Sequence, residues 1–391
     1  MRSIRHALVP AVAVAAVLAG CGGASSPPTE VARPSAEVAS ALASRGIDAA
    51  AWRTDFTRAS VPLSEFRSGG PGRDGIPPVD DPRFTTVARA SKELPAREPV
   101  LVVEGRKTVR AYPLRILVWH EIVNDELDGV PIAVTYCPLC NSSVVFDRRV
   151  DGRTLRFGTT GSLRRSDLVM WDDRTESWWQ QITGEAVVGT LVGRRLRQLR
   201  SLTLSAGELR RTHPDAEVMT QDTGHERDYG RNPYVGYDEA ASEPFLLEGR
   251  ADRRLQPKER VLAVRRGRDA VVLPIALARR RGVVRFEAFG RQVVALYAPG
   301  VASALDAEEI RKARDVGTAA LYEPRVDGRP LSLRPAEQPG QFVDRDGTVW
   351  DIAGRAVSGP GAGGRLPAVQ HDEQFWFAFA AFLTGEVEIV R

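Results

Sequence analysis

The chain carries the same unit twice, and this internal repeat constrains its fold more than any other feature. Segments of the first half match segments of the second half at one constant offset and without a gap, so that position 136, for example, corresponds to position 297. The matches pair 100–103 with 261–264, 113–114 with 274–275, Gly129 with Gly290, 136–138 with 297–299 and, after an insertion, 149–153 with 325–329 and 184–187 with 354–357. Self-similarity of this kind predicts two related structural units. We therefore expect a first repeat over 45–250 and a second, degenerate repeat over 251–391.

Within each unit the local pattern is mostly that of β-strands. Runs of apolar and β-branched residues are separated by Asp-Gly pairs, which signal a hairpin between extended segments. These pairs stand at 128–129, 151–152, 327–328 and 346–347. Helical patterns are fewer and are expected around 113–122, 205–211, 307–314 and 372–382. We predict a β-rich α+β fold, with two related sheet-containing repeats packed into one body.

The two copies differ at their cysteines, and this difference bears on function. Cys137 and Cys140 form a C-x-x-C in the first copy, where the second copy has an alanine and a valine. The second copy also has an arginine in place of His120. If both copies share a fold, that fold does not require the cysteine pair. We therefore expect the first copy to carry the functional site and the second to serve as a scaffold.

The first 21 residues are typical of a bacterial lipoprotein signal. Arg2 and Arg5 precede an apolar run from Ala7 to Ala19, and a basic start followed by a short apolar stretch is typical of a secretory signal. The next residues resemble a lipobox, in which the cysteine, here Cys21, is lipidated; an ordinary signal peptide is the alternative. Residues 22–44 are rich in Gly, Ser, Pro and Ala and are expected to form a flexible linker. We expect an extracytoplasmic protein, lipid-anchored to the cell membrane.

Charge and motifs exclude several classes of function. The net charge is +4, and the short arginine clusters lack interleaved aromatic residues, which is typical of a solvated face and not of a nucleic-acid partner. The sequence has no P-loop, no dinucleotide glycine fingerprint, no H-E-x-x-H and no G-x-S-x-G. We expect no nucleotide cofactor. The sequence names no substrate and no small-molecule or protein partner, and it leaves open whether the chain is an enzyme.

Several segments together resemble the bacterial domain of unknown function family 3179. They span roughly residues 70 to 391, and the Cys-Pro-Leu-Cys segment with its flanks is the most specific of them. The segments are 119–125, 135–140, 157–161, 166–170, 175–177, 227–229, 232–234 and 375–379. The loop at 157–161 carries Thr160 where the family is expected to have serine. The resemblance implies a secreted or anchored setting and implies no activity.

The first of three interpretations of Cys137 and Cys140 is a metal site. Two thiolates at this spacing can hold one ion. His120 and Met170 lie in segments that resemble the family's, so the resemblance makes them the expected completing ligands. Thiolates with a thioether or an imidazole are soft donors, so copper is favoured over zinc, which usually takes four ligands. The residues expected near the cleft are Glu121, Asn124, Asp125, Ser166 and Asp167.

Two other interpretations of the cysteine pair stay open. The pair can act as a redox dithiol, because a C-x-x-C lowers one thiol pKa and an extracytoplasmic setting permits exchange. The sequence around it lacks the βαβ pattern of a thioredoxin, however. The pair can also form a local disulfide that only stabilises a turn. In that case aromatic and glycine-rich loops would hold a small ligand, and the chain would be a binding module.

Overall fold

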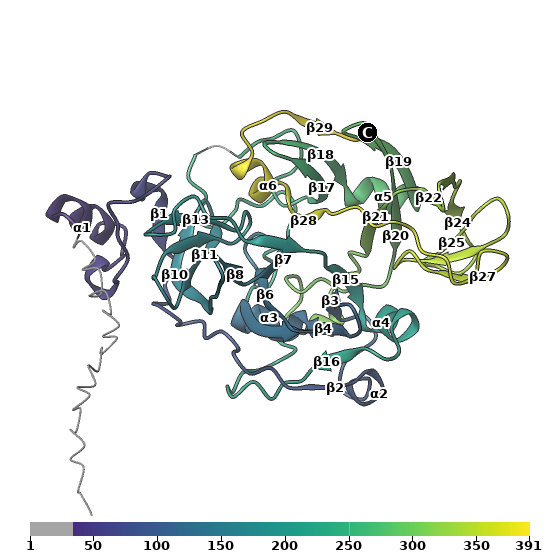
Figure 1. The fold of residues 1–391 in the computed structure, drawn as a ribbon, viewed down its shortest axis with the longest axis horizontal. Helices are drawn as coiled ribbons and strands as arrows, with labels where there is room; N and C mark the ends of the chain where they lie inside the picture. Colours follow the sequence, from purple (N-terminus) through teal and green to yellow (C-terminus); the bar gives the residue numbers. More distant parts are fainter. Residues whose placement is uncertain (1–33, 250) are drawn as a thin grey trace, which may run out of the picture. The chain divides into compact units, whose positions relative to one another are not determined.

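A computed structural model describes residues 34–391 except residue 250. The signal segment, Cys21 and the first part of the expected linker lie outside the described residues. In the described part, 29 strands and six short α-helices build a β-rich α+β fold (Figure 1), which confirms the predicted fold class. Among these helices, none combines the length and apolar character of a membrane-spanning segment.

Three sheets of four or five strands are built from the first half of the chain. The site sheet contains, in spatial order, β1 (Phe66–Ser68), β10 (Phe157–Arg164), β11 (Asp167–Asp172), β12 (Trp178–Gln180) and β13 (Glu185–Val188). The cysteine sheet contains β14 (Arg197–Leu199), β7 (Ser142–Asp147), β6 (Val130–Cys137) and β5 (Ile122–Leu127). The third contains β15 (Leu202–Ser205), β3 (Pro99–Glu104), β4 (Val109–Pro113), β16 (Glu217–Met219) and β2 (Phe84–Thr86). The C-x-x-C therefore begins in one sheet, and Asp167 begins a strand of another.

The second half forms three further sheets of three or four strands, and it repeats an order of elements seen in the first half. The sheets contain β28 (Asp372–Phe375), β17 (Arg260–Arg266), β18 (Asp269–Pro274) and β29 (Val387–Ile389); β19 (Val283–Ala288), β20 (Arg291–Ala298) and β21 (Thr318–Tyr322); and β24 (Arg334–Pro335), β25 (Gln341–Val343), β26 (Val349–Asp351) and β27 (Ala356–Ser358). The order β3, β4, α3 (Leu114–His120), β5, β6 recurs as β17, β18, α5 (Ile275–Arg281), β19, β20.

The predicted hairpins are confirmed at the Asp-Gly pairs. Asp128 and Gly129 have φ values of 51° and 79° and join β5 to β6. A type I′ turn requires positive φ at both central residues, and its backbone twist matches that of the two strands it joins. The same conformation joins β8 (Arg149–Val150) to β9 (Arg153–Thr154), and β22 (Arg325–Val326) to β23 (Arg329–Pro330). The fourth pair lies between β25 and β26.

Helices occupy most of the ranges predicted for them. They are α3, α4 (Ala206–Thr212) and α6 (Trp376–Phe382), although 372–375 belongs to β28; α2 (Val87–Ala90) and α5 were not predicted. The helix predicted over 307–314 was wrong, since only one 3₁₀ turn forms there, at Ile310–Lys312. Backbone groups of that segment bond to another loop instead, because the Asn232 amide donates to the Glu308 carbonyl at 2.8 Å.

The range expected as a linker is partly folded, which corrects its predicted end. Residues Ala36–Ala43 form α1, whose N-cap Ser35 accepts a hydrogen bond from the Val38 amide at 3.2 Å. Leu42 of this helix is fully buried, in a cluster that includes Phe56 and Trp178. Its apolar side chain therefore anchors the helix against the site sheet.

A shared core joins the two halves of the chain. One hydrophobic cluster contains Val100 and Val102 of β3 together with Val294 and Leu296 of β20. A separate cluster surrounds the C-x-x-C and is made mainly of the strands of the first half. Strand β28 reaches this second cluster through Phe375, so the last part of the chain helps to enclose the cysteines.

Candidate metal centre and adjoining cavity

The C-x-x-C lies on a turn that is fixed from both sides. Cys137 is the last residue of β6, and Cys140 precedes β7. Asn141 adopts a left-handed φ of 47°, which asparagine tolerates better than most residues, and its amide donates to the Pro138 carbonyl at 3.2 Å. The Phe375 amide donates to the Cys140 carbonyl at 2.9 Å. The positions of both sulfurs are thus set by backbone contacts from two parts of the chain.

Asp167 joins the two cysteines in one buried cluster. Single ligand atoms of Cys137, Cys140 and Asp167 lie within 4.8 Å of one another, and all three side chains are buried. The Cys140 thiol donates to Asp167 Oδ1 and to the Ser166 carbonyl, both at 3.4 Å. The residues before Asp167, Arg165 and Ser166, have φ values of 52° and 68°. This left-handed turn between β10 and β11 brings the carboxyl to the sulfurs.

The acidic groups of the cluster are poorly solvated. Asp167 Oδ2 accepts hydrogen bonds from Gln180 Nε2 at 2.5 Å and from the Ile182 amide at 3.1 Å. Burial nevertheless raises the pKa of Asp167 to about 6. Burial also raises the pKa of the Cys137 thiol and, more strongly, that of the Cys140 thiol. Both sulfurs are free thiols, and each is protonated at neutral pH unless a cation lies beside it.

Glu121 adds a fourth buried acidic group. It follows α3 with a φ of 59°, whereas the second half has Gly282 after α5 with a φ of 71°. The Glu121 side chain is 7% exposed, and burial, with a smaller contribution from Asp167, raises its pKa to about 8. A strained, buried carboxyl at a position where glycine serves equally well is more typical of a functional site than of a structural one.

No described cation neutralises this group of acids directly. The Arg164 guanidinium interacts electrostatically with Asp167, but it makes its ion pair with Glu65, at 2.7 Å. Within the described chain, nothing donates a hydrogen bond to the Glu121 carboxyl, whose pKa responds only to burial and to Asp167. Four acidic groups therefore share a buried region without a counter-charge of their own.

A cavity of about 330 Å³ adjoins the cluster. Glu121 lines it, as do Leu139 and Leu168, which are the chain neighbours of Cys140 and Asp167. The remaining lining residues are mostly apolar or aromatic: Gly69, Pro71, Ile76, Thr159, Gly161, Ser162, Leu163, Tyr234, Tyr237 and Phe245. The cavity thus reaches the backbone that carries the acidic cluster.

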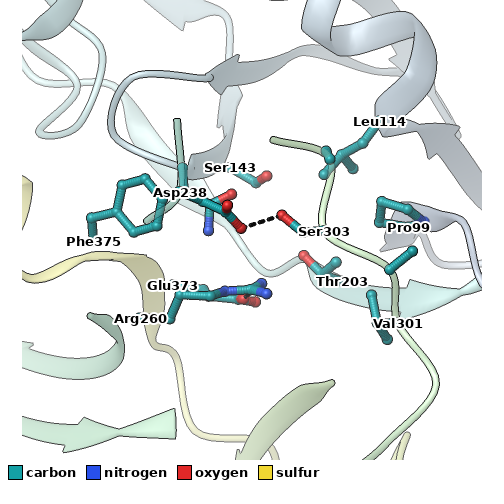
Figure 2. Close-up of a pocket in the computed structure, with 13 residues that line it drawn as sticks. Pro99, Leu114, Ser143, Thr203, Asp238, Arg260, Val301, Ser303, Glu373 and Phe375 are labelled. Atoms are coloured by element: carbon teal, nitrogen blue, oxygen red, sulfur yellow. Dashed lines mark hydrogen bonds and ion pairs between the residues drawn. The ribbon is translucent and has the colours of Figure 1, made fainter. Parts of the chain in front are cut away.

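The wall formed by 234–245 is held by residues of the second half of the chain. The Tyr237 amide donates to the Leu305 carbonyl at 3.0 Å, and the Ser303 hydroxyl donates to Asp238 (Figure 2). Lys258 Nζ donates to the Tyr237 carbonyl at 2.8 Å and to Ser242 Oγ at 2.9 Å. Burial lowers the pKa of Lys258 to about 8. The second half therefore contributes to the site by positioning this wall.

His120, expected as a metal ligand, lies outside the three-residue cluster. Its Nδ1 lies 2.7 Å from the Pro77 carbonyl oxygen, and its Nε2 lies 2.6 Å from the Tyr229 hydroxyl. The ring is fully buried, and burial lowers its pKa to about 4. Both ring nitrogens are thus engaged, and the neutral imidazole links α3 to the loop that carries Tyr229.

Asn124 and Asp125, expected near the cleft, make structural contacts. Asn124 Nδ2 donates to the Phe157 carbonyl at 2.8 Å, and its Oδ1 accepts from the Phe157 amide at 2.9 Å. These bonds join β5 to β10. Asp125 accepts hydrogen bonds from Arg110 and, at 2.6 Å, from the Tyr112 hydroxyl. Asn124 therefore joins the cysteine sheet to the site sheet, and Asp125 joins the cysteine sheet to β4 of the third sheet.

Ser166 adjoins the cluster directly, since its carbonyl accepts from the Cys140 thiol, whereas Met170 is placed only in the surrounding hydrophobic core. Met170 is fully buried and belongs to the same hydrophobic cluster as the two cysteines. Ser166 is fully buried, and its hydroxyl finds no hydrogen-bond partner within the described part of the chain. Sequence reasoning missed Gln180 and Lys258, which orient Asp167 and the cavity wall, and no motif marks either of them.

Comparison with known proteins supports the family resemblance. A model of the family described as "Protein of unknown function (DUF3179)" matches residues 73–385. No curated protein and no solved structure matches the chain.

Proposed function

We propose that this chain, which belongs to the DUF3179 family, binds one thiophilic metal ion through Cys137, Cys140 and Asp167. The observation that carries the proposal is the convergence of two thiols and one carboxyl in a single buried cluster. Ionising such buried groups is costly unless a cation lies beside them, and a bound metal ion supplies that cation. A metal ion would lower the pKa of both thiols and accept all three donors at once.

The donor set fits a thiophilic ion. Two sulfurs with one carboxylate oxygen are accepted by Zn²⁺, whereas Cu⁺ prefers sulfur and imidazole donors. Because the third donor is Asp167 and His120 is bonded elsewhere, the balance moves from copper towards zinc. Copper remains the alternative if the Met170 thioether completes the set. Three protein ligands would leave one coordination position open, as in catalytic zinc sites.

Thiol–disulfide exchange is the second candidate, and the environment of the cysteines disfavours it. Reactive thiols are partly exposed and have lowered pKa values. Cys137 and Cys140 are 1% and 0% exposed, and burial raises the pKa of both thiols. A purely structural disulfide is disfavoured by the second half, where the element order of β3 to β6 recurs without cysteines.

In this proposal the chain is a duplicated, lipid-anchored extracytoplasmic protein. The constant sequence offset and the recurring element order support the duplication. The second repeat would act as a scaffold, since Lys258 and Ser303 position one wall of the cavity. The lipidated Cys21 rests on the resemblance of residues 18–21 to a lipobox.

The metal content of the full-length protein tests the proposal. The protein is purified in mild detergent without a chelator or a histidine tag, and metals and free thiols are measured on the same sample. We expect about one equivalent of zinc or copper per chain, lost in Cys137→Ser and strongly reduced in Asp167→Asn. Asp215→Asn is the matched control: Asp215 is an exposed aspartate outside the cluster, so this variant should retain the metal. Absence of metal, with no uptake by the fully reduced protein, would contradict the proposal.

A further inference from the structure

We infer that the cavity beside Glu121 binds a small apolar amine. The cavity and its unpaired carboxyl carry this inference, and neither depends on a bound metal. It therefore goes beyond the metal site and can be tested in metal-free protein.

The size and lining of the cavity fit a small apolar molecule. Its volume of about 330 Å³ lies at the lower end of the range of about 300–1,000 Å³ found for ligand sites. Three aromatic residues, Tyr234, Tyr237 and Phe245, and the leucines at 139, 163 and 168 line it. Such a surface favours a ligand whose body is a hydrocarbon chain or ring.

Glu121 provides one polar anchor within this apolar lining. Its side chain is 7% exposed and lines the cavity, and no described residue donates a hydrogen bond to its carboxyl. Its backbone is fixed, because its amide donates to the Leu117 carbonyl at 2.7 Å and its carbonyl accepts from the Tyr136 amide at 2.8 Å. A buried polar group without a partner is costly, so a ligand that donates hydrogen bonds to it gains that free energy on binding.

The surrounding charges select the polar group of the ligand. Asp167 lies close enough to Glu121 to raise the pKa of that carboxyl, so an anionic ligand beside the two groups would be repelled. Among the described residues, the ammonium near this wall is that of Lys258, which lies 3.5 Å from the Tyr237 ring centroid, donates to the Tyr237 carbonyl and to Ser242, and does not line the cavity. An alkylammonium would stabilise the ionised form of the Glu121 carboxyl and pair with it, and it would also be attracted by the rings of Tyr234 and Phe245.

Three probes with one hydrocarbon chain test the choice of end group. Octylamine, octanol and octanoate are each titrated by calorimetry into the full-length protein after a chelator has removed metals. We expect octylamine to bind at least about tenfold more tightly than octanoate, the effect of one favourable charge-assisted contact, with octanol between them. Equal binding of octylamine and octanoate, or no binding of octylamine, would overturn the inference.

Two variants assign the binding to this cavity. Glu121→Gln should lose the preference for octylamine and still bind octanol, whereas Glu126→Gln, which changes an exposed glutamate on the adjoining strand β5, should behave as wild type. Leu163→Trp should fill the cavity and weaken all three probes, which keeps the test decisive if Glu121→Gln does not fold. Undiminished binding of octylamine by Leu163→Trp would overturn the inference.

One further variant separates this inference from the metal proposal. Cys137→Ser should lose the metal and keep the preference for octylamine. If it keeps its metal and wild-type protein binds octylamine, the metal proposal fails alone. If wild-type protein binds metal but no octylamine, only the amine inference fails.

Discussion

We expect the stability of the wild-type protein to fall between pH 6.5 and 8, and replacing Glu121 by glutamine should abolish this fall. The carboxyl is buried, and its pKa is raised from 4.5 to about 8 in the folded chain. Between these two values the folded state holds a proton that the unfolded state has released. The free energy of unfolding therefore falls as the pH rises.

The window from pH 6.5 to 8 isolates this group from the others. The pKa of Asp167 is about 6, so Asp167 is already mostly ionised at pH 6.5 and adds little to the pH dependence of stability above that value. His120, whose pKa falls from 6.5 to about 4, acts in the opposite direction and mainly below pH 6.5. Lys258, with a pKa of about 8, contributes mainly above the window.

The size of the effect follows from the pKa shift. Each pH unit over which the folded state holds one extra proton lowers the free energy of unfolding by about 1.4 kcal/mol. Because the carboxyl is partly ionised near pH 8, the ionisation of Glu121 should lower the free energy of unfolding by roughly 1.5–2 kcal/mol between pH 6.5 and 8. Glutamine keeps the size of the side chain and cannot ionise, so the variant should lose this part of the pH dependence.

Urea denaturation followed by tryptophan fluorescence measures the effect. Wild type, Glu121→Gln and the control Glu126→Gln are compared at half-unit steps of pH, after metals have been removed. The difference between wild type and Glu121→Gln should change steadily with pH, while the control should follow wild type. A difference that is constant from pH 6.5 to 8 would refute the assignment of a buried, protonated carboxyl at this position.

Two further predictions concern residues that frame the site. Gly161→Ala should lower the melting temperature much more than Gly152→Ala. Both glycines have positive φ, but a Cβ at position 161 would lie 2.0 Å from the Pro71 carbonyl oxygen, whereas a Cβ at position 152 would meet open space. Equal losses in a thermal melt would count against this packing. Asn124→Ala should cost about 2–4 kcal/mol, because it leaves the Phe157 amide and carbonyl unpaired; a loss below about 1 kcal/mol in urea denaturation would show that β5 and β10 do not depend on this bond.

The sequence predicted the strand-rich character of the fold well, because its signals are local. Asp-Gly pairs specify tight turns through their backbone preferences, and the three hairpins with positive φ at both residues follow from them. The helix predicted over 307–314 failed because its backbone groups pair with residues distant in the sequence. The linker was predicted too long because the burial of Leu42 depends partly on residues more than a hundred positions away, such as Trp178.

The site was predicted only in part. Cys137 and Cys140 are three positions apart, so the sequence alone identified them as a candidate pair. Asp167 is distant in the sequence and reaches them only through the turn at 165–166. Nothing local to Asp167 marks it as a third donor. Glu121 could have been identified more firmly, since the constant offset aligns it with Gly282, and a glutamate at a left-handed position is unusual.

X-ray absorption of the metal-loaded, full-length protein tests the central claim most directly, since it counts the donor atoms around the ion. We predict two sulfur neighbours at about 2.3 Å and nitrogen or oxygen neighbours at about 2.0–2.2 Å. In Asp167→Asn the sulfur count should stay at two while the lighter shell changes. A first shell without sulfur, or one that the loss of Cys140 leaves unchanged, would contradict a metal centre built on Cys137, Cys140 and Asp167.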